Sequence, residues 1–176
     1  MSGKNKAHDG GHSPLPCSHD GDPVKIGRST IYAGGGMYLS PETMARYELR
    51  VFLRAERNSE NFAFGHTARG FLWLPIVDYQ TVQEHNWAVW KVRLQQVYGQ
   101  MQQGKRVIVF CAGGHGRTGL FLASLLALAE PDINDPVAEI RHRYCDKAVE
   151  TAEQAAQVLR FLRETRATRV AETMKG

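Results

Sequence analysis

Hydrophobic residues gather in separate runs along the chain, and the runs differ in pattern. Residues 71–77 and 107–110 are apolar without polar alternation, which is typical of strands buried on both faces of a sheet. Residues 29–33, followed by a glycine turn at 34–36, and residues 48–53 are weaker strand candidates. The stretch from Leu120 to Ala129 is apolar on nearly every side, as expected of a helix inside the core.

Further helices are predicted from their start signals. Ser40 before Pro41 begins a short helix that reaches residue 47, and Asp135 before Pro136 begins another that ends near residue 144. In both cases a short polar side chain can accept hydrogen bonds from the first free N–H groups of the helix. A proline follows at the one position where its missing N–H costs nothing.

Capping-box patterns mark two longer helices. Thr81 with Glu84 predicts a helix from residue 81 to about residue 103. Its core-facing residues would be Trp87, Trp90, Leu94, Val97 and Met101. Thr151 with Gln154 predicts the start of the last helix. Its buried stripe would be Ala155, Val158, Leu159 and Leu162.

The order of these elements predicts a three-layer α/β domain. Its mostly parallel central sheet would have roughly four to five strands, with helices on both faces. The strands lie near residues 30, 50, 72 and 107. At 176 residues and 43% hydrophobic composition, the chain suits one domain with a proper core and is too short for two typical domains. Residues 1–23 are polar and glycine-rich and predict a flexible tail, which leaves residues 24–176 for the domain.

Composition narrows the partners and the compartment. The net charge of +4 is small and lies partly in the arginine-rich last helix, so no nucleic acid partner is expected. The sequence shows neither an apolar run of about 18 residues nor a secretory signal, which predicts a cytoplasmic protein without a membrane span. Cys17, Cys111 and Cys145 are too scattered for a disulfide framework. Nothing in the pattern indicates an oligomeric state.

The most informative stretch is the loop between the strand at 107–110 and the helix at 120–129. Its first residue, Cys111, stands six positions before Arg117. The residues between them are Ala112, Gly113, Gly114, His115 and Gly116. A glycine-rich loop at the start of a helix can turn successive N–H groups inward and form a cradle for an anion. The same field favours the thiolate form of Cys111, which is a nucleophile.

Two residues at the end of this loop complete a chemistry suited to phosphate esters. Arg117 offers a planar fork that can hold two oxygens of a tetrahedral dianion while the thiolate attacks phosphorus. Thr118 can direct its hydroxyl at the sulfur and make it a better leaving group in a second step. Such a site requires no metal and no other cofactor, because the cradle and the arginine supply the positive charge.

The pattern Cys-x5-Arg followed by Thr118 and Gly119 resembles the signature of the cysteine-dependent protein tyrosine phosphatase superfamily, especially its dual-specificity-like members. The resemblance implies hydrolysis of phosphomonoesters through a phosphocysteine intermediate. Most members have histidine directly before the cysteine, where this chain has Phe110. A phosphate-binding module with weak or no turnover therefore stays open. Sulfur-transfer and arsenate-reducing enzymes also use a cysteine anion loop but fit the Thr-Gly pair less well.

Departure of an alkoxide or phenolate from phosphorus requires a proton, and Asp78 is the predicted donor. It directly follows the strand at 71–77, and the carboxyl ends of parallel strands meet at one edge of a sheet, where Cys111 also lies. It resembles the mobile general-acid aspartate of the superfamily, which precedes the cysteine by a similar interval. Glu84 and Asp132 are poorer candidates.

Two residues near the last helix have two interpretations each. Gln154 resembles the glutamine that orients the hydrolytic water in the superfamily, but the capping box is the favoured reading. Cys145 is a resolving thiol for oxidised Cys111 or, as favoured, a buried structural cysteine.

The substrate follows from the resemblance. Phosphotyrosine in proteins is expected, with phosphoserine and phosphothreonine as the dual-specificity extension, because the loop has no additional lysine. His115 keeps a phosphoinositide or inositol phosphate open, since a partly protonated imidazole resembles the basic loop of the phosphoinositide-directed members.

Two groups of polar residues are interpreted as solvated. The first lies near the N-terminus and comprises His8, His12, Cys17, His19 and Asp22. It lacks a recognisable ligand spacing, so no metal site is predicted there. The second lies in a loop region near the predicted site and comprises Arg54, Arg57, His66 and Arg69. Solvated charges are favoured over contacts to phosphate for this group.

Overall fold

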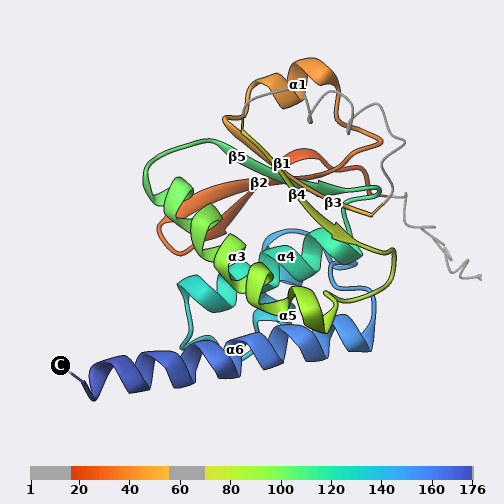
Figure 1. Cartoon of the computed structure of the whole chain (residues 1–176). Coiled ribbons are helices and arrows are strands. Elements are labelled where there is room, and N and C mark those ends of the chain that lie inside the picture. Colours follow the sequence, from red (N-terminus) through yellow and green to blue (C-terminus); the bar gives the residue numbers. More distant parts are fainter. Residues whose placement is uncertain (1–16, 56–69, 176) are drawn as a thin grey trace, which may run out of the picture.

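The computed structural model describes residues 17–55 and 70–175, which form a five-stranded sheet with helices on both faces (Figure 1). The strands are β1 (Asp20–Ile26), β2 (Ser29–Gly35), β3 (Leu49–Arg54), β4 (Phe71–Ile76) and β5 (Val107–Cys111). Their order across the sheet is β1-β2-β5-β3-β4, and every neighbouring pair is parallel except β1 with β2. The predicted three-layer α/β class with a mostly parallel sheet is therefore confirmed.

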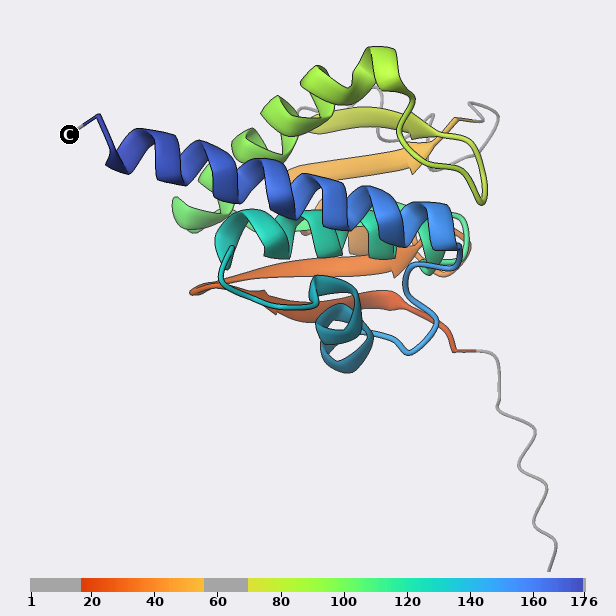
Figure 2. The ribbon, with the colours of Figure 1, turned by 90° about the horizontal axis from the view of Figure 1, so that it is seen from below.

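The helices divide unequally between the two faces. They are α1 (Pro41–Ala45), the 3-10 turn η1 (Glu84–Asn86), α3 (Trp87–Gln102), α4 (Gly116–Ala129), α5 (Pro136–Arg143) and α6 (Ala152–Thr173). Short α1 lies on one face, and the longer helices lie on the other (Figure 1). Within that layer α4 is central, with α3, α5 and α6 packed against it (Figure 2). None of the helices in the two described ranges is long and apolar enough to span a bilayer.

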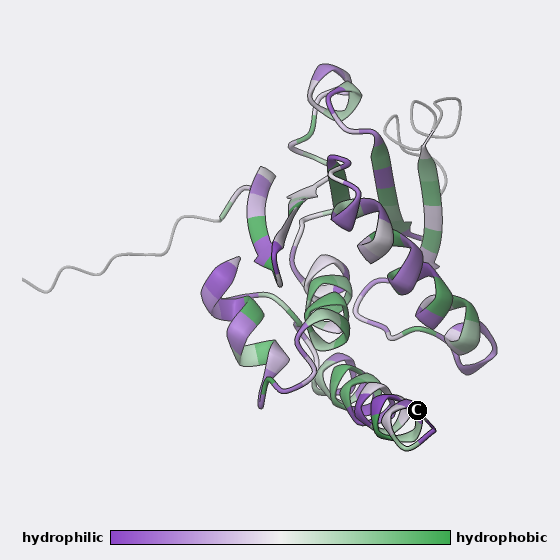
Figure 3. Cartoon of the chain, turned by 90° about the vertical axis from the view of Figure 1, so that its left-hand side faces the viewer, coloured by the Kyte–Doolittle hydropathy of each residue, from purple (hydrophilic) through white to green (hydrophobic). Residues whose placement is uncertain are grey.

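Strand β5 separates two hydrophobic cores, because its side chains alternate between the faces of the sheet. Val109 and Cys111 belong to the main core beneath the long helices, whereas Ile108 and Phe110 belong to the smaller one beneath α1. All five residues of β5 are buried, as its unbroken apolar pattern predicts. Helix α4 is hydrophobic along most of its length (Figure 3), and it is buried from Gly116 to Ala127.

Three of the four predicted helix starts are present, at Ser40, Asp135 and Thr151, and one is displaced. Ser40 Oγ accepts from the N–H of Thr43 at 3.1 Å, and Asp135 Oδ1 accepts from two N–H groups of α5. The predicted start at Thr81 is wrong, because α3 begins only at Trp87 after the η1 turn. The backbone N–H of Val82 instead donates to Gln157 Oε1 of α6, so a tertiary contact replaces the predicted local cap.

The buried faces of α3 and α6 test the predicted stripes. Every predicted core residue of α3 is buried. In α6 the prediction holds for Val158 and Leu162, but Leu159 is 38% exposed and Phe161 is buried in its place. The phase of the stripe is shifted because α6 packs against both α4 and α5.

Strand β1 corrects the predicted boundary of the N-terminal tail at residue 23. Residues 20–26 pair antiparallel with β2, and Val24 and Ile26 are fully buried. Polar residues in the first half of the strand concealed it from the hydrophobic pattern. Pro23 is compatible with this position because β1 lies at the edge of the sheet.

Candidate active site

Cys111 ends β5, at the edge of the sheet where the parallel strands have their carboxyl ends. Its Sγ accepts hydrogen bonds from the N–H of Gly114 at 3.3 Å and from Thr118 Oγ1 at 3.2 Å. Both donors stabilise negative charge on sulfur, and the sulfur also faces the amino end of α4. The predicted contact between Thr118 and the sulfur is therefore present.

The carbonyl groups of the loop from Cys111 to Arg117, called here the cysteine loop, are held on its outer side. The carbonyl of Cys111 accepts from the N–H of Gly36 at 2.7 Å, and that of Ala112 accepts from Met37. The carbonyl of Gly114 accepts from the hydroxyl of Tyr144 at 2.7 Å. Burial raises the pKa of Tyr144, so this hydroxyl keeps its proton and remains a donor. With these carbonyls fixed outward, the loop is set to present N–H groups inward, which suits an anion.

Glycines at the end of β2 form the floor beneath the cysteine loop. The predicted turn at 34–36 lies two residues later, at 36–38, because β2 continues to Gly35, whose partner across the sheet is Cys111. A Cβ on Gly35 would lie 2.7 Å from the carbonyl carbon of Gly113, and one on Gly114 would lie 2.9 Å from Gly34. Gly114 also has a positive φ of 87°. The glycines on both sides are required because the two backbones touch.

Replacing Gly35 by alanine is expected to destabilise the fold by about 1–3 kcal/mol, because the added methyl group has no space against Gly113. Urea denaturation monitored by circular dichroism measures this change. The matched control is Gly99→Ala in α3, where an added Cβ meets nothing within 4 Å. That variant should gain about 0.5–1 kcal/mol, since alanine is the better helix former. Equal stability of the two variants would contradict the close contact beneath the loop.

Arg117 lies in the first turn of α4 and is only 2% exposed. Its guanidinium donates to the carbonyl of Ile76 at 3.2 Å, and its Nη2 forms an ion pair with Asp78 Oδ1 at 2.9 Å. Asp78 is half exposed and follows β4 closely. The structure therefore brings the predicted acid and the predicted phosphate-binding arginine into direct contact at the edge where Cys111 lies.

The two poorer acid candidates lie elsewhere. The Glu84 carboxylate is bound by Arg160 of α6 in an ion pair of 2.6 Å. Asp132 follows the carboxyl end of α4, which is about 20 Å long at 1.5 Å per residue, whereas the cysteine loop lies at the amino end. Glu84 is thus occupied by Arg160, and Asp132 lies beyond the end of α4 that is remote from the cysteine loop.

Gln154 is fully buried, and its side chain is engaged at both ends. Its Oε1 accepts from the N–H groups of Glu150 and Thr151, and its Nε2 donates to the carbonyl of Gln80. The capping box with Thr151 is present. The favoured structural reading is confirmed, and the water-positioning role stays a prediction that would require Gln154 to exchange one of these partners.

Glu150 is a residue at the loop that the sequence reasoning missed. A Cβ on Gly116 would collide with its carboxylate, so the acid lies directly against the cysteine loop. Partial burial raises the pKa of the Glu150 carboxyl, opposed by the N–H of Gly116, and the nearby Asp78 raises it further. Its position directly before the capping box was the only signal in the sequence. It adds a second carboxyl group beside Asp78 and Arg117.

His115 and Cys145 lie together on the outer side of the loop. The Cys145 sulfur is 3.6 Å from Nδ1 of His115 and 3.7 Å from the sulfur of Cys17. Burial raises the pKa of the Cys145 thiol to about 11, which disfavours the nucleophilic thiolate that a resolving role needs. Burial also lowers the pKa of His115, and the nearby His19 lowers it further, so the partly protonated imidazole that suggested an inositol phosphate is not favoured.

Phe110, which stands where the superfamily has histidine, has a packing role. It is fully buried beneath α1, and its ring lies 5.3 Å from that of Phe52. Its side chain points away from the face that carries the Cys111 sulfur.

Of the residues predicted as solvated, His8, His12, Arg57, His66 and Arg69 lie outside the described ranges. The Arg54 carbonyl accepts from the indole of Trp73.

The fold of this chain is similar to that of solved phosphatase structures. The active form of Tk-PTP superposes with a TM-score of 0.62 at 22% identity, covering 81% of this chain and 96% of that one. PTPMT1 gives 0.64 at 17% identity, covering 86% and 99%. Human DUSP28 gives 0.59 at 13% identity, covering 87% and 97%. At these identities the similarity defines the fold class, which is that of the protein tyrosine phosphatases.

Residues 44–175 match the family described as "PTP-SAK: Swiss Army Knife protein, DSP-PTPase phosphatase domain", and the chain belongs to this family of dual-specificity-type phosphatase domains. Two curated relatives are uncharacterised proteins of Methanocaldococcus jannaschii. MJ0215 is 38% identical over 94 residues, covering 52% of this chain and 55% of the relative. MJECL20 is 36% identical over 95 residues, covering 53% and 60%. The chain thus spans little more than half the length of the curated relatives it matches.

Proposed function

We propose that this chain hydrolyses phosphomonoesters through a phosphocysteine intermediate, within a single catalytic domain. The observation that carries the proposal is the Cys111 sulfur, which two hydrogen-bond donors hold at the amino end of α4, in a loop that ends at the buried Arg117. A structural cysteine would need neither donor nor the buried arginine. Membership of the phosphatase family supports the same chemistry.

In the first step the Cys111 sulfur attacks phosphorus, and the bond from phosphorus to the leaving oxygen breaks. The loop N–H groups and Arg117 hold the equatorial oxygens, on which charge accumulates in the transition state. To do so, Arg117 exchanges its contact with Asp78 for phosphate oxygens. Asp78, released and half exposed, takes up a proton from the solvent and transfers it to the leaving oxygen.

In the second step water attacks the phosphocysteine, and the bond from phosphorus to sulfur breaks. Asp78 now accepts the proton of the water, so that phosphate leaves and the thiolate is restored. The hydroxyl of Thr118 and the N–H of Gly114 stabilise the departing sulfur. Glu150, in contact with the loop at Gly116, is a second carboxyl group available to orient the water.

We propose a protein phosphomonoester as substrate, with phosphotyrosine first. The His115 ring contacts the sulfurs of Cys17 and Cys145, and burial lowers its pKa. The ring therefore does not add positive charge to the cradle. A highly anionic inositol lipid is therefore the less favoured substrate. One solved PTPMT1 structure is a complex with PI(5)P, a fact about that protein which makes the lipid a necessary comparison.

Side-by-side kinetics test this assignment. The 176-residue chain is assayed with a phosphotyrosine peptide, a phosphothreonine peptide, soluble PI(5)P and p-nitrophenyl phosphate, each with and without vanadate. The highest kcat/KM is expected for the phosphotyrosine peptide, with inhibition by vanadate. A higher value for PI(5)P would overturn the substrate class. Binding of vanadate without hydrolysis of any of the four would overturn the enzyme and favour a phosphate-binding module.

The role of Asp78 is expected to depend on the leaving group. Asp78→Asn should slow hydrolysis of phenyl phosphate on the order of 10²–10³-fold, because phenolate needs a proton to depart. It should slow a substrate with an acidic phenol, such as p-nitrophenyl phosphate, far less. Glu84→Gln is the matched control and should leave both rates unchanged, since Glu84 is bound by Arg160. Equal slowing of both substrates by Asp78→Asn would remove Asp78 from the acid role.

A further inference from the structure

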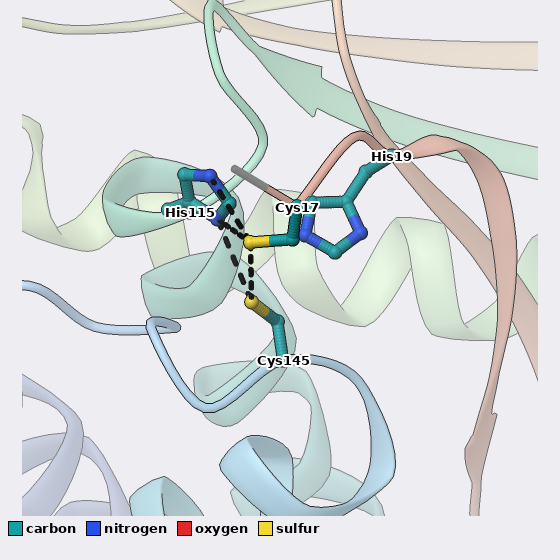
Figure 4. Close-up of side chains that lie close together, drawn as sticks. All are labelled: Cys17, His19, His115 and Cys145. Atoms are coloured by element: carbon teal, nitrogen blue, oxygen red, sulfur yellow. Dashed lines mark hydrogen bonds between the residues drawn. The ribbon is translucent and has the colours of Figure 1, made fainter. Parts of the chain in front are cut away.

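Two sulfurs and two imidazoles from distant parts of the chain meet beside the cysteine loop (Figure 4). This group, called here the cysteine–histidine cluster, comprises Cys17, His19, His115 and Cys145. Two members precede β1, one directly precedes α4 as its N-cap residue, and one follows α5. One potential ligand atom of each lies within 4.8 Å of those of the others, and His19 and Cys145 are buried. Nothing in the hydrolytic mechanism uses Cys17, His19 or Cys145.

The distances among the two sulfurs and the His115 ring are close to those of a tetrahedral zinc site, and a ring nitrogen of His19 lies within 4.8 Å of the other ligand atoms. Zinc bonds of about 2.3 Å to sulfur and 2.0–2.1 Å to nitrogen place two sulfurs about 3.8 Å apart, and a sulfur and a nitrogen about 3.5 Å apart. The sulfurs of Cys17 and Cys145 are 3.7 Å apart, and Nδ1 of His115 lies 3.6 Å from the Cys145 sulfur and 3.9 Å from the Cys17 sulfur.

His19 provides an independent indication of a ligand. Only 4% of this residue is exposed, and its Nε2 is buried without a hydrogen-bond partner in the described residues. An unsatisfied buried nitrogen is costly unless something binds it. Its other nitrogen, Nδ1, bonds Asp22 Oδ2 at 2.5 Å. A carboxylate on Nδ1 fixes the tautomer that leaves the lone pair of Nε2 free, as in carboxylate–histidine–zinc arrangements.

We propose that the cysteine–histidine cluster is a structural Zn²⁺ site. Two thiolates and two imidazoles in tetrahedral array favour zinc over hard cations, and four protein ligands leave no open position for a catalytic water. The buried thiol of Cys145 loses its proton on binding, as metal-bound thiols do. A disulfide between Cys17 and Cys145 would leave the orientation of both imidazoles and the unpartnered nitrogen of His19 unexplained.

The ion fastens the N-terminal segment to the cysteine loop. His115 lies between Gly114 and Gly116 of that loop, and the carbonyl of His19 accepts from the N–H of Gly35, in the floor beneath it. Zinc therefore joins three segments of the chain around the anion cradle, without touching the phosphate. Its role is to hold the outer side of the loop, not to participate in the hydrolysis.

Metal content and cobalt spectroscopy test the site directly. The 176-residue chain, without a polyhistidine tag and purified with a phosphine reductant, should contain one zinc ion per chain as measured by inductively coupled plasma mass spectrometry. Exchange for Co²⁺ should give thiolate-to-cobalt charge-transfer absorption and the intense visible bands of a tetrahedral site. Excess zinc should raise the melting temperature of the metal-free protein by roughly 10 °C. Reduced protein that binds neither ion would overturn the proposal.

Variants identify the ligands. Cys17→Ser and Cys145→Ser should lose the charge-transfer absorption, whereas Cys111→Ser should retain it, since that sulfur lies outside the cluster. A double variant, His8→Ala with His12→Ala, should retain the zinc. That result would show that these two histidines are not the zinc ligands. If the Cys17→Ser and Cys145→Ser variants keep full zinc content, the assignment of these ligands is wrong. The metal content of the wild-type protein decides the matter even where a variant fails to fold.

Asp22 is a positioning residue, because its carboxylate orients the His19 ring. Substituting it distinguishes a metal site from a cluster of side chains that are only packed together. Asp22→Asn should weaken zinc binding roughly 10- to 100-fold, because it removes the carboxylate that orients His19. Asp20→Asn, an exposed change on the same strand, is the matched control and should leave the affinity unchanged. Titration of metal-free protein in competition with a chromophoric chelator measures both values. Equal affinity of the two variants would contradict the role of Asp22.

Discussion

Replacing Cys111 by serine is expected to reduce kcat on the order of 10⁵-fold or more while the protein still binds vanadate or phosphate. The hydroxyl is a far weaker nucleophile than a thiolate, and the loss of a covalent nucleophile typically costs this much. The change is nearly isosteric. The N–H of Gly114 and the hydroxyl of Thr118, which bond the sulfur, keep an acceptor in place.

The check is a pair of measurements on one preparation. Turnover of p-nitrophenyl phosphate is followed by absorbance, and phosphate binding is followed by calorimetry. Residual turnover within tenfold of the wild type would show that the sulfur is not the nucleophile. A loss of binding and turnover together, with an unchanged circular dichroism spectrum, would show that the serine has altered the cradle itself.

Arg117→Lys is expected to lower kcat about 10³-fold, although the charge is retained. A lysine ammonium is a point charge, whereas the guanidinium holds two oxygens in a fixed plane. Its transition-state contacts in phosphoryl transfer are typically worth at least this factor. The Kd for phosphate should rise by a smaller factor than kcat falls. The reason is that the equatorial oxygens carry more negative charge in the transition state than in the bound ground state.

A second buried arginine provides the control for Arg117→Lys. Arg50 in β3 is 7% exposed and donates to the carbonyl groups of Met44 and Tyr47, near the beginning of its strand. Arg50→Lys should lower the melting temperature because those carbonyls lose their donors, but it should leave kcat unchanged. If the two variants lost activity in proportion to stability, the effect at Arg117 would be structural.

The elements that the sequence predicts well are those whose cause is local. The run from Val107 to Phe110 is short and rich in β-branched residues, which favours a buried strand, and the spacing from Cys111 to Arg117 is set within one loop. The cap at Asp135 and the box at Thr151 likewise require only three or four consecutive residues. In these cases propensity, pattern and tertiary structure all favour the same conformation.

The failures have tertiary causes. Thr81 does not begin α3, because Gln157 of α6 takes the N–H of Val82. β1 shows no apolar run because only Val24 and Ile26 of its seven residues face the core as buried hydrophobic side chains. Such pairings bring together residues far apart in the chain, and no local pattern encodes them.

The same limit applies to the site. Asp78 was found because both it and Cys111 follow strands, which is a rule about the edge of a parallel sheet. Glu150 was missed because no such rule covers a loop between two helices. Cys17 and His19 looked like solvated residues because their partners, His115 and Cys145, are about a hundred or more positions away in the sequence.

The glycine floor of β2 has a consequence for how anions enter. The contacts from Gly35 to Gly113 and from Gly34 to Gly114 fix the backbone of the loop before any ligand arrives. Little ordering entropy is then lost on binding, so stripping water from the incoming oxyanion becomes the main cost. Association should accordingly follow a single exponential whose rate rises linearly with vanadate concentration, without the plateau that a slow rearrangement of the receptor would impose.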